Sequence, residues 1–253
     1  MIYLEGDMMA WRWLRGWSAL LDLFLPPACA LCGKTLASAA EPQLCPTCLS
    51  DIPPLGPASC RRCALPYPAE NGSDHLCQSC LLQPPPFARV VTAGIYDRAL
   101  RQAIHRFKFD GAIGLDRPLA HLLARVLGEA PENAFDLLVP VPLHPARLRH
   151  RTYNQSLLLG RELSRLTGLP LRSELLRRLR PTPPQQGLDA EERRRNLRGA
   201  FAAPKPLHGQ RILLLDDVLT TGATARECSS VLLDAGASEV SVAVLARAPR
   251  HFS

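Results

Sequence analysis

The sequence lacks a long uncharged apolar run and is poor in lysine, with only Lys34, Lys108 and Lys205 among its 30 basic residues. Without about 18 consecutive apolar residues, no membrane-spanning helix is expected. The segment 9–27 comes nearest to a signal peptide, but charged residues interrupt it and no clean small-residue cleavage site follows. We therefore expect a cytoplasmic protein without membrane insertion, and we interpret this segment as a short helix docked on the body.

Because lysine is scarce, arginine carries most of the positive charge, and its guanidinium group holds phosphates and carboxylates in a fork. A genome that favours arginine codons produces the same composition, so composition alone assigns no ligand. The placement of the charge is more informative. Residues 1–85 carry a net charge of −2 and residues 86–253 a net charge of +9, which together give the +7 of the chain. Attraction to phosphates or nucleic acid is therefore expected from the C-terminal part.

Eight of the nine cysteines form four pairs of the type Cys-x-x-Cys. Twelve residues separate the first pair from the second and thirteen separate the third from the fourth, which is close to zinc-ribbon spacing. Two residues between thiolates let a tight turn present both sulfurs to one tetrahedral ion. The expected zinc ligands are Cys29, Cys32, Cys45, Cys48, Cys60, Cys63, Cys77 and Cys80.

Other uses of these cysteines stay open at the level of sequence. Disulfides need an oxidising compartment, for which no export signal is visible, and four evenly arrayed copies argue against a redox pair. Sequential pairing assigns the first two pairs to one ion and the last two to another, whereas a cross-braced arrangement joins the first pair with the third; we favour sequential pairing. Each site has four ligands and no open position, so both zinc ions are expected to be structural. We interpret His75 as a loop side chain and Cys228 as a small buried apolar residue.

A proline-rich run at residues 81–89 follows the cysteines. Consecutive prolines neither continue a helix nor join a sheet, so this run is expected to form a stiff spacer. We therefore divide the chain into residues 1–85, an N-terminal helix with a small double zinc-ribbon module, and residues 86–253, a second domain.

Strand-like and helix-like segments alternate in the second domain. Strands are predicted at 89–96, 136–143, 211–219 and 238–248, and helices at 98–109, 114–129, 154–168 and 223–235. Strands that alternate with helices indicate an α/β fold with a central, mostly parallel sheet flanked by helices.

The most informative segment is 211–227, where an apolar strand leads into two carboxylates and a Thr-Thr-Gly-Ala-Thr turn. Ligands of open α/β sheets bind outside the carboxyl ends of the strands. Loop amides, threonine hydroxyls and a helix N-terminus favour a phosphate there, and Gly222 permits close approach of the backbone. Asp216 and Asp217 lie where they can accept hydrogen bonds from two ribose hydroxyls. The segment thus predicts a pocket for a ribose 5-phosphate; a generic strand–turn–helix is the alternative, and the lack of a lysine after the glycine excludes a P-loop.

This segment resembles the phosphoribosyl pyrophosphate (PRPP) motif of type I phosphoribosyltransferases. The resemblance implies the fold of that superfamily and PRPP bound with Mg²⁺, which is held chiefly by the pyrophosphate and ribose hydroxyls of the ligand. Asp216 and Asp217 are then the catalytic candidates, in the sense that they orient the sugar. The residues implied in PRPP binding are Asp216, Asp217, Thr220, Thr221, Gly222, Ala223 and Thr224.

Two further segments, residues 139–156 and 182–201, together with the cysteine pairs, resemble the ComF family, which is associated with DNA uptake in natural competence. The resemblance extends from about residue 20 to residue 248. It implies that the loop after residue 143 faces the pyrophosphate of PRPP. Arg151 is the best candidate contact because it adjoins the matched Tyr-Asn-Gln motif, and Arg147 and Arg149 are further candidates.

Residues 185–201 correspond to the mobile hood of such enzymes, with Arg193, Arg194 and Arg195 as candidates for contact with the pyrophosphate. An exposed amphipathic helix is the alternative for this stretch. Lys108 resembles the lysine of a Lys-Phe/Tyr-x-Gly element of the family and is a further candidate for a phosphate contact. An ordinary surface position explains each of these basic residues as well.

Three hypotheses of function follow from the resemblance. In the first, a competence protein binds PRPP or a related phosphoribosyl ligand and assists the entry of transforming single-stranded DNA. In the second, the chain is an active phosphoribosyltransferase that uses PRPP and an unidentified base or amine acceptor. In the third, the zinc module is an adaptor that recruits a DNA-processing partner, such as a competence helicase.

Overall fold

The computed structural model describes residues 26–37, 43–67, 75–129, 134–146, 148, 153–181 and 190–249. The helix predicted within residues 9–27 lies almost wholly outside these ranges, and so do Arg147, Arg149 and Arg151. Of Arg193 and Arg194 only the backbone is described.

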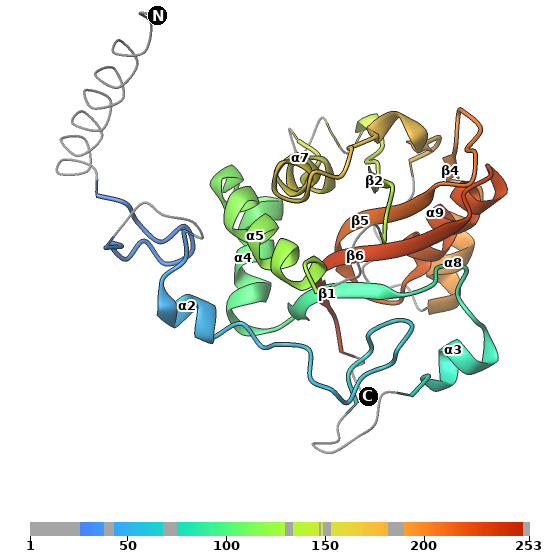
Figure 1. Cartoon of the computed structure of the whole chain (residues 1–253). Helices are drawn as coiled ribbons and strands as arrows, with labels where there is room; N and C mark the ends of the chain where they lie inside the picture. The colour runs from blue at the N-terminus through green and yellow to red at the C-terminus, as the bar shows by residue number, and fades with distance from the viewer. Residues whose placement is uncertain are drawn as a thin grey trace, which may run out of the picture.

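A four-stranded sheet forms the centre of the C-terminal part (Figure 1). Its strands are β1 (Val90–Ile95), β2 (Leu137–Pro140), β5 (Arg211–Leu219) and β6 (Glu239–Arg247), in the order β1-β6-β5-β2. Every pairing in this sheet is parallel. The two inner strands, β5 and β6, read as nearly continuous apolar runs because both of their faces are covered. The expectation of a central parallel sheet is confirmed.

Helices cover both faces of this sheet (Figure 1). On one face lie α4 (Arg98–Phe109), α5 (Asp116–Leu127) and α7 (Gln155–Thr167), and on the other lie α8 (Ala190–Leu197) and α9 (Ala223–Asp234). The two faces are packed by alternate residues of the strands, since side chains point in turn to opposite sides. The expected helices are therefore present, with bounds that differ by only a few residues.

Shorter elements complete the described part. Single-turn 3-10 helices occupy Ile113–Leu115 and Ser173–Leu175. A second sheet consists of two antiparallel strands, β3 (Arg177–Arg178) and β4 (Phe201–Ala202). The sequence did not predict this sheet, because two residues are too few to show a period.

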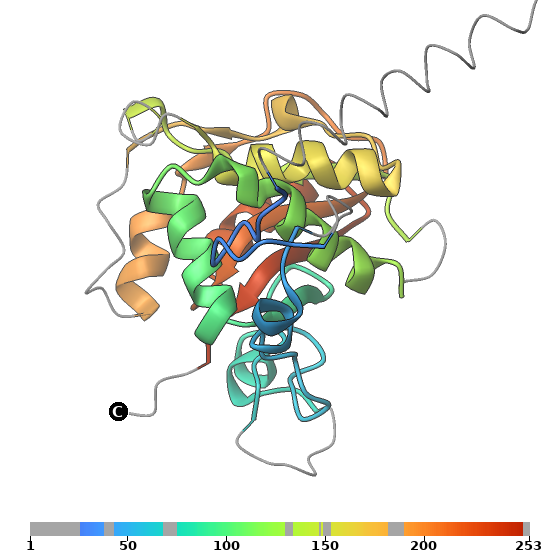
Figure 2. The ribbon, with the colours of Figure 1, turned by 90° about the vertical axis from the view of Figure 1, so that its left-hand side faces the viewer.

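The cysteine region, with the short helices α2 (Pro46–Ser50) and α3 (Gln78–Leu82), packs directly on the α/β part. Figure 1 and Figure 2 show both helices below the sheet, and Figure 1 shows α2 on the side of α4 and α3 on the side of α8. The first group of cysteines joins the apolar core on the face of α4, α5 and α7, whereas the second joins the core on the face of α9. Each cysteine group therefore contributes to one of the two halves of the core.

The segment between the two cysteine groups runs along the edge strand β1. The carbonyl of Pro53 accepts a hydrogen bond from the amide of Ile95 at 2.9 Å, and the Asp51 carboxylate accepts one from the amide of Ala99 at 3.1 Å, in the first turn of α4. A Cβ atom on Gly94 would lie 2.6 Å from the Pro53 carbonyl oxygen, so a side chain there is excluded by the backbone. The zinc module is thus fixed to β1 and α4 by backbone contacts.

Candidate functional site

The predicted ligand loop connects β5 to α9. Asp216 and Asp217 lie within the last four residues of β5, and Thr220 and Thr221 are exposed in the turn that follows. Gly222 has a φ of +78° and precedes the first turn of α9, a left-handed conformation that favours glycine. The turn therefore exposes two threonines and a helix N-terminus beside two carboxylates. The binding of a phosphoribosyl ligand by these groups stays a prediction.

The Asp216 carboxylate is held by neighbouring hydrogen-bond donors. Its Oδ1 accepts a hydrogen bond from the Ser156 hydroxyl at 3.2 Å and one from the Asp217 amide at 2.9 Å. Burial of the carboxylate, together with the charge of Asp217, raises the pKa of Asp216 to about 7, although Lys108 acts in the opposite direction. Asp216 therefore changes its charge close to neutral pH.

Lys108 is the nearest cation to these carboxylates among the described residues. Its Nζ lies 2.7 Å from Oδ1 of Asp217, and both side chains are largely buried, with exposed fractions of 17% and 13%. Lys108 stands in the last turn of α4, so the end of that helix reaches the ligand loop. The sequence suggested Lys108 as a candidate for a phosphate contact. In this structure Lys108 is paired with a carboxylate of the site.

The start of α7 fastens the end of α4 to the site. Asn154 caps α7 by accepting a hydrogen bond from the amide of Ser156 at 3.0 Å, and its side-chain amide donates to the Val141 carbonyl at 3.2 Å. Gln155 donates to the Lys108 carbonyl at 3.3 Å. These residues belong to the motif that suggested the ComF resemblance, so the same motif that pointed to Arg151 also contains the supports of the carboxylates.

The predicted hood is only partly described. Its helix, α8, packs on α9, and Arg195 is exposed on it. Arg180 donates to the carbonyls of Asn196 and Arg198 at 3.0 and 2.7 Å, and the amide of Gly199 donates to the Glu227 carboxylate at 2.6 Å. The C-terminal end of this stretch is therefore anchored to the α9 side of the domain. Residues 182–189 lie outside the described residues, and the contact of the hood with pyrophosphate stays a prediction.

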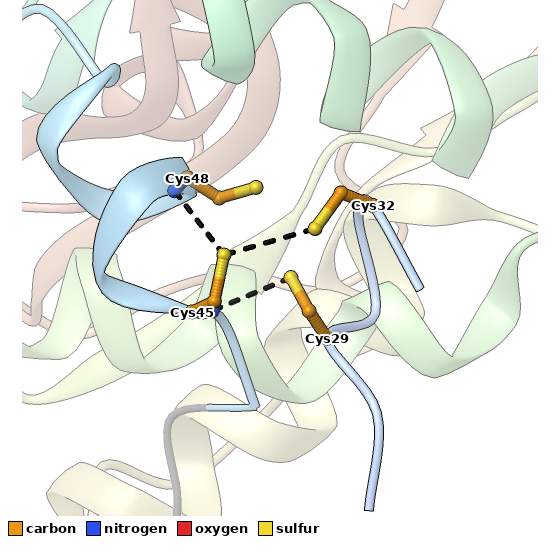
Figure 3. A group of neighbouring side chains, drawn as sticks. All are labelled: Cys29, Cys32, Cys45 and Cys48. Carbon is orange, nitrogen blue, oxygen red and sulfur yellow. Dashed lines mark hydrogen bonds between the residues drawn. The ribbon is translucent and has the colours of Figure 1, made fainter. Parts of the chain in front are cut away.

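Two groups of four cysteines bring their sulfurs together. The first consists of Cys29, Cys32, Cys45 and Cys48 and the second of Cys60, Cys63, Cys77 and Cys80, with all sulfurs of a group within 4.8 Å of one another. Figure 3 shows the four sulfurs of the first group pointing into a common space. The groups follow the sequential pairing and not the cross-braced one.

The geometry of each group fits a tetrahedral zinc ion. The sulfurs of Cys32 and Cys45 lie 3.7 Å apart, as do those of Cys63 and Cys77, and a tetrahedron with a Zn–S bond of about 2.3 Å has an edge of about 3.8 Å. No described cysteine is in a disulfide. Burial opposes ionisation of Cys29, but the amides of Cys45, Cys32 and Leu31 outweigh it and lower the pKa of Cys29 to about 6. The groups thus fit two structural zinc ions.

His75 and Cys228 lie outside these groups, as expected. The ring of His75 stacks on that of Tyr67, with centroids 4.3 Å apart and an interplanar angle of 9°. Cys228 is fully buried in α9, and burial raises the pKa of its thiol.

Among the described residues no helix has the length and apolar character needed to cross a membrane.

Two family models match different parts of the chain. Residues 20–81 match the double zinc ribbon domain family, and residues 166–251 match the phosphoribosyl transferase domain family. The chain is 36% identical to competence protein F of Haemophilus influenzae, over 73% of this chain and 86% of that protein.

Two further relatives extend over most of the chain. The DNA utilization protein YhgH of Escherichia coli O157:H7 is 36% identical over 89% of this chain and 99% of its own length. Competence protein ComFC of Streptococcus pneumoniae is 28% identical over 87% of this chain and 99% of its own length.

Proposed function

Because the chain belongs to the ComF family of competence proteins, we propose that it binds PRPP at the loop of residues 216–224 and assists the uptake of transforming single-stranded DNA in the cytoplasm. The proposal that PRPP is the ligand rests on the pair of aspartates beside a Thr-Thr-Gly turn at a helix N-terminus. The names of the relatives, which refer to competence and DNA utilization, support the second part.

The described residues suggest how the ligand is held. The amides and hydroxyls of Thr220, Thr221 and Thr224 bind the 5-phosphate, since a helix N-terminus favours a negative charge. Asp216 and Asp217 accept hydrogen bonds from two ribose hydroxyls. Two adjacent carboxylates also suit a hard divalent cation, and Mg²⁺ bound with PRPP supplies charge neutralisation for the pyrophosphate. The Lys108 ammonium lies 2.7 Å from Asp217, and in this proposal it shifts to the pyrophosphate when PRPP binds.

Release of pyrophosphate distinguishes a binding protein from an active transferase. Wild-type protein is mixed with PRPP, Mg²⁺ and a panel of bases, amines and amides. We expect that PRPP binds and that no acceptor causes measurable release, since the names of the relatives refer to competence and DNA utilization. Release with any acceptor would instead show that the chain is an active phosphoribosyltransferase. In that reaction the ribose would pass through an oxocarbenium-like state while Asp216 and Asp217 orient it.

We further propose that Arg193, Arg194 and Arg195 of α8 contact single-stranded DNA, because they lie in the basic C-terminal part of the chain, and charge reversal at these positions tests this site. The variant Arg193→Glu/Arg194→Glu/Arg195→Glu is expected to bind single-stranded DNA at least about tenfold more weakly in 50 mM salt. It should also lose up to about two units of the slope of log K against log salt concentration, because each phosphate contact to a single strand contributes about 0.7. Fluorescence anisotropy with a labelled oligonucleotide measures both quantities.

A matched variant keeps the change in net charge but moves it to the other face of the sheet. Arg125, Arg161 and Arg172 are exposed on or near α5 and α7, and their reversal to Glu should weaken binding less than the variant in α8. Equal affinity of the α8 variant and the wild type would show that this site is wrong.

A further inference from the structure

Arg247, the last residue of β6, is a buried arginine that connects separate parts of the chain. It is 5% exposed. Its Nε donates to the carbonyl of Cys63 at 2.8 Å, and its Nη1 donates to the carbonyls of Leu219 and Thr220 at 2.8 and 2.7 Å. A further hydrogen bond goes to the carbonyl of Ala248. One guanidinium group thus binds the backbone on two sides of the end of the sheet.

These carbonyls belong to two functional segments. Leu219 ends β5, and Thr220 is the first threonine of the ligand loop, so Arg247 holds the point where the loop leaves the sheet. Cys63 belongs to the second cysteine group. The contact with Arg247 therefore joins the expected phosphate loop to the second zinc site through a single side chain.

The register of the sheet places Arg247 between the ends of the two neighbouring strands. It lies opposite Leu219 of β5 on one side and Ile95 of β1 on the other. The amide of Ala248 also donates to the Leu219 carbonyl at 3.0 Å, so that carbonyl is held twice. The start of the ligand loop is consequently held by donors from the end of β6 and the residue that follows it.

Charge explains why an arginine is tolerated in this buried place. A tetrathiolate zinc site has a net charge of −2, and the Cys63 carbonyl brings the guanidinium close to it. A guanidinium group presents five N–H donors in a fixed plane, whereas an ammonium is a compact point charge that does not reach acceptors on two sides in the same way. Arginine is therefore the residue that serves both segments at once.

We infer that Arg247 is a positioning residue that fixes the phosphate loop to the second cysteine group, so that affinity for PRPP depends on this contact although Arg247 does not touch the ligand. The inference rests on the proposed function. The zinc ribbon then supports the α/β domain, because its Cys63 carbonyl holds the guanidinium group that fixes the loop.

The test uses Arg247→Lys, which keeps the charge but not the fork, and Arg247→Met, which removes both. Calorimetric titration with PRPP and Mg²⁺ should show affinity lowered on the order of tenfold for Arg247→Lys and more for Arg247→Met. Metal analysis should still find two zinc ions per chain in the Lys variant, and hydrogen exchange should be faster at the amides of residues 219–222.

Arg226 offers a matched control. From α9 it donates to the carbonyls of Gln83 and Pro84 at 2.7 and 3.2 Å, so it also joins the α/β domain to the end of the zinc module, and both of these carbonyls lie outside the ligand loop. Arg226→Met should keep PRPP affinity within about twofold of the wild type. Equal losses in Arg226→Met and Arg247→Lys would contradict the inference, as would an Arg247→Lys variant with wild-type affinity and exchange.

The two proposals fail in different ways. If wild-type protein does not bind PRPP, the proposed function is wrong, whereas wild-type binding with an unaffected Arg247→Lys overturns only the role of Arg247. If the Arg247 variants do not fold, zinc chelation of the wild type is the replacement measurement. At a chelator concentration that leaves the α/β part folded, a larger acceleration of exchange at residues 219–222 than in β2 supports the role of Arg247, and an equal or smaller acceleration at residues 219–222 contradicts it.

Discussion

Asp216→Asn is expected to lose PRPP binding by about 100-fold or more and, at the same time, to stabilise the folded chain at alkaline pH. The loss follows because the neutral amide is a weaker acceptor for ribose hydroxyls and removes one of the two charges of the site. Calorimetry with PRPP and Mg²⁺ measures the affinity. Asp234→Asn, an exposed position at the end of α9, removes the same charge far from the loop and should bind as the wild type does.

The gain in stability follows from the direction of the pKa shift. The ordinary pKa of an aspartate is 3.8, and burial raises the pKa of Asp216 to about 7. Between about pH 4 and about pH 7, therefore, Asp216 keeps its proton in the folded chain and has released it in the unfolded chain. The free energy of unfolding of the wild type therefore decreases as pH rises from about 4 to about 7. An asparagine carries no such cost, so the variant should be more stable than the wild type at pH 8 by about 1–3 kcal/mol and not at pH 4.

Asp217→Asn distinguishes the contribution of each carboxylate. It should also weaken PRPP binding, but it leaves the buried ammonium of Lys108 without its carboxylate at 2.7 Å and gains no stability at pH 8. Urea unfolding at both pH values gives these free energies. A wild-type affinity for PRPP in Asp216→Asn, or an Asp216→Asn variant less stable than the wild type at pH 8, would contradict this description of the site.

Removal of zinc is expected to destabilise the whole chain and not the cysteine region alone. The first cysteine group packs with α4 and α5, and the second packs with α9 on the opposite face of the sheet. Structural zinc ions contribute on the order of 10 kcal/mol to the folding of small domains. We expect a strong chelator to lower the midpoint of thermal unfolding by at least about 10 °C, measured by circular dichroism in the α/β signal, and zinc addition to restore it.

Cys228→Ala is the control for this experiment. It removes a cysteine that lies outside both groups, so zinc content should stay at two ions per chain and the response to the chelator should match that of the wild type. A chelated wild-type chain with an unchanged unfolding midpoint would show that the zinc ions do not support the α/β part. The same result would argue for an independent module, as the division at residue 85 implied.

Local patterns predicted most of the elements. The helix expected at 98–109 is α4 with the same bounds, because its apolar residues recur at the helical period and face the core. The apolar run of residues 212–215 predicted β5, since both faces of that strand are buried. The spacing of the cysteine pairs predicted the two groups, because that spacing acts within a short segment.

Contacts between distant segments were not predictable in the same way. Nothing in the sequence near Lys108 indicates that its partner is Asp217, more than 100 residues later, since that pair depends on where the end of α4 meets β5. Arg247 is the last residue of an apolar strand and has no motif of its own, so its role depends on the packing of the second cysteine group. The packing of the two cysteine groups against opposite faces of the sheet depends in the same way on contacts between distant segments.

A crystal structure of the wild-type protein with PRPP and Mg²⁺ tests whether the loop of residues 216–224 holds the ligand. We expect the 5-phosphate within hydrogen-bond distance of the amides and hydroxyls of residues 220–224, ribose hydroxyls on Asp216 and Asp217, and the Lys108 ammonium shifted toward the ligand. PRPP bound elsewhere, or this loop without ligand at saturating PRPP, would contradict the proposed site.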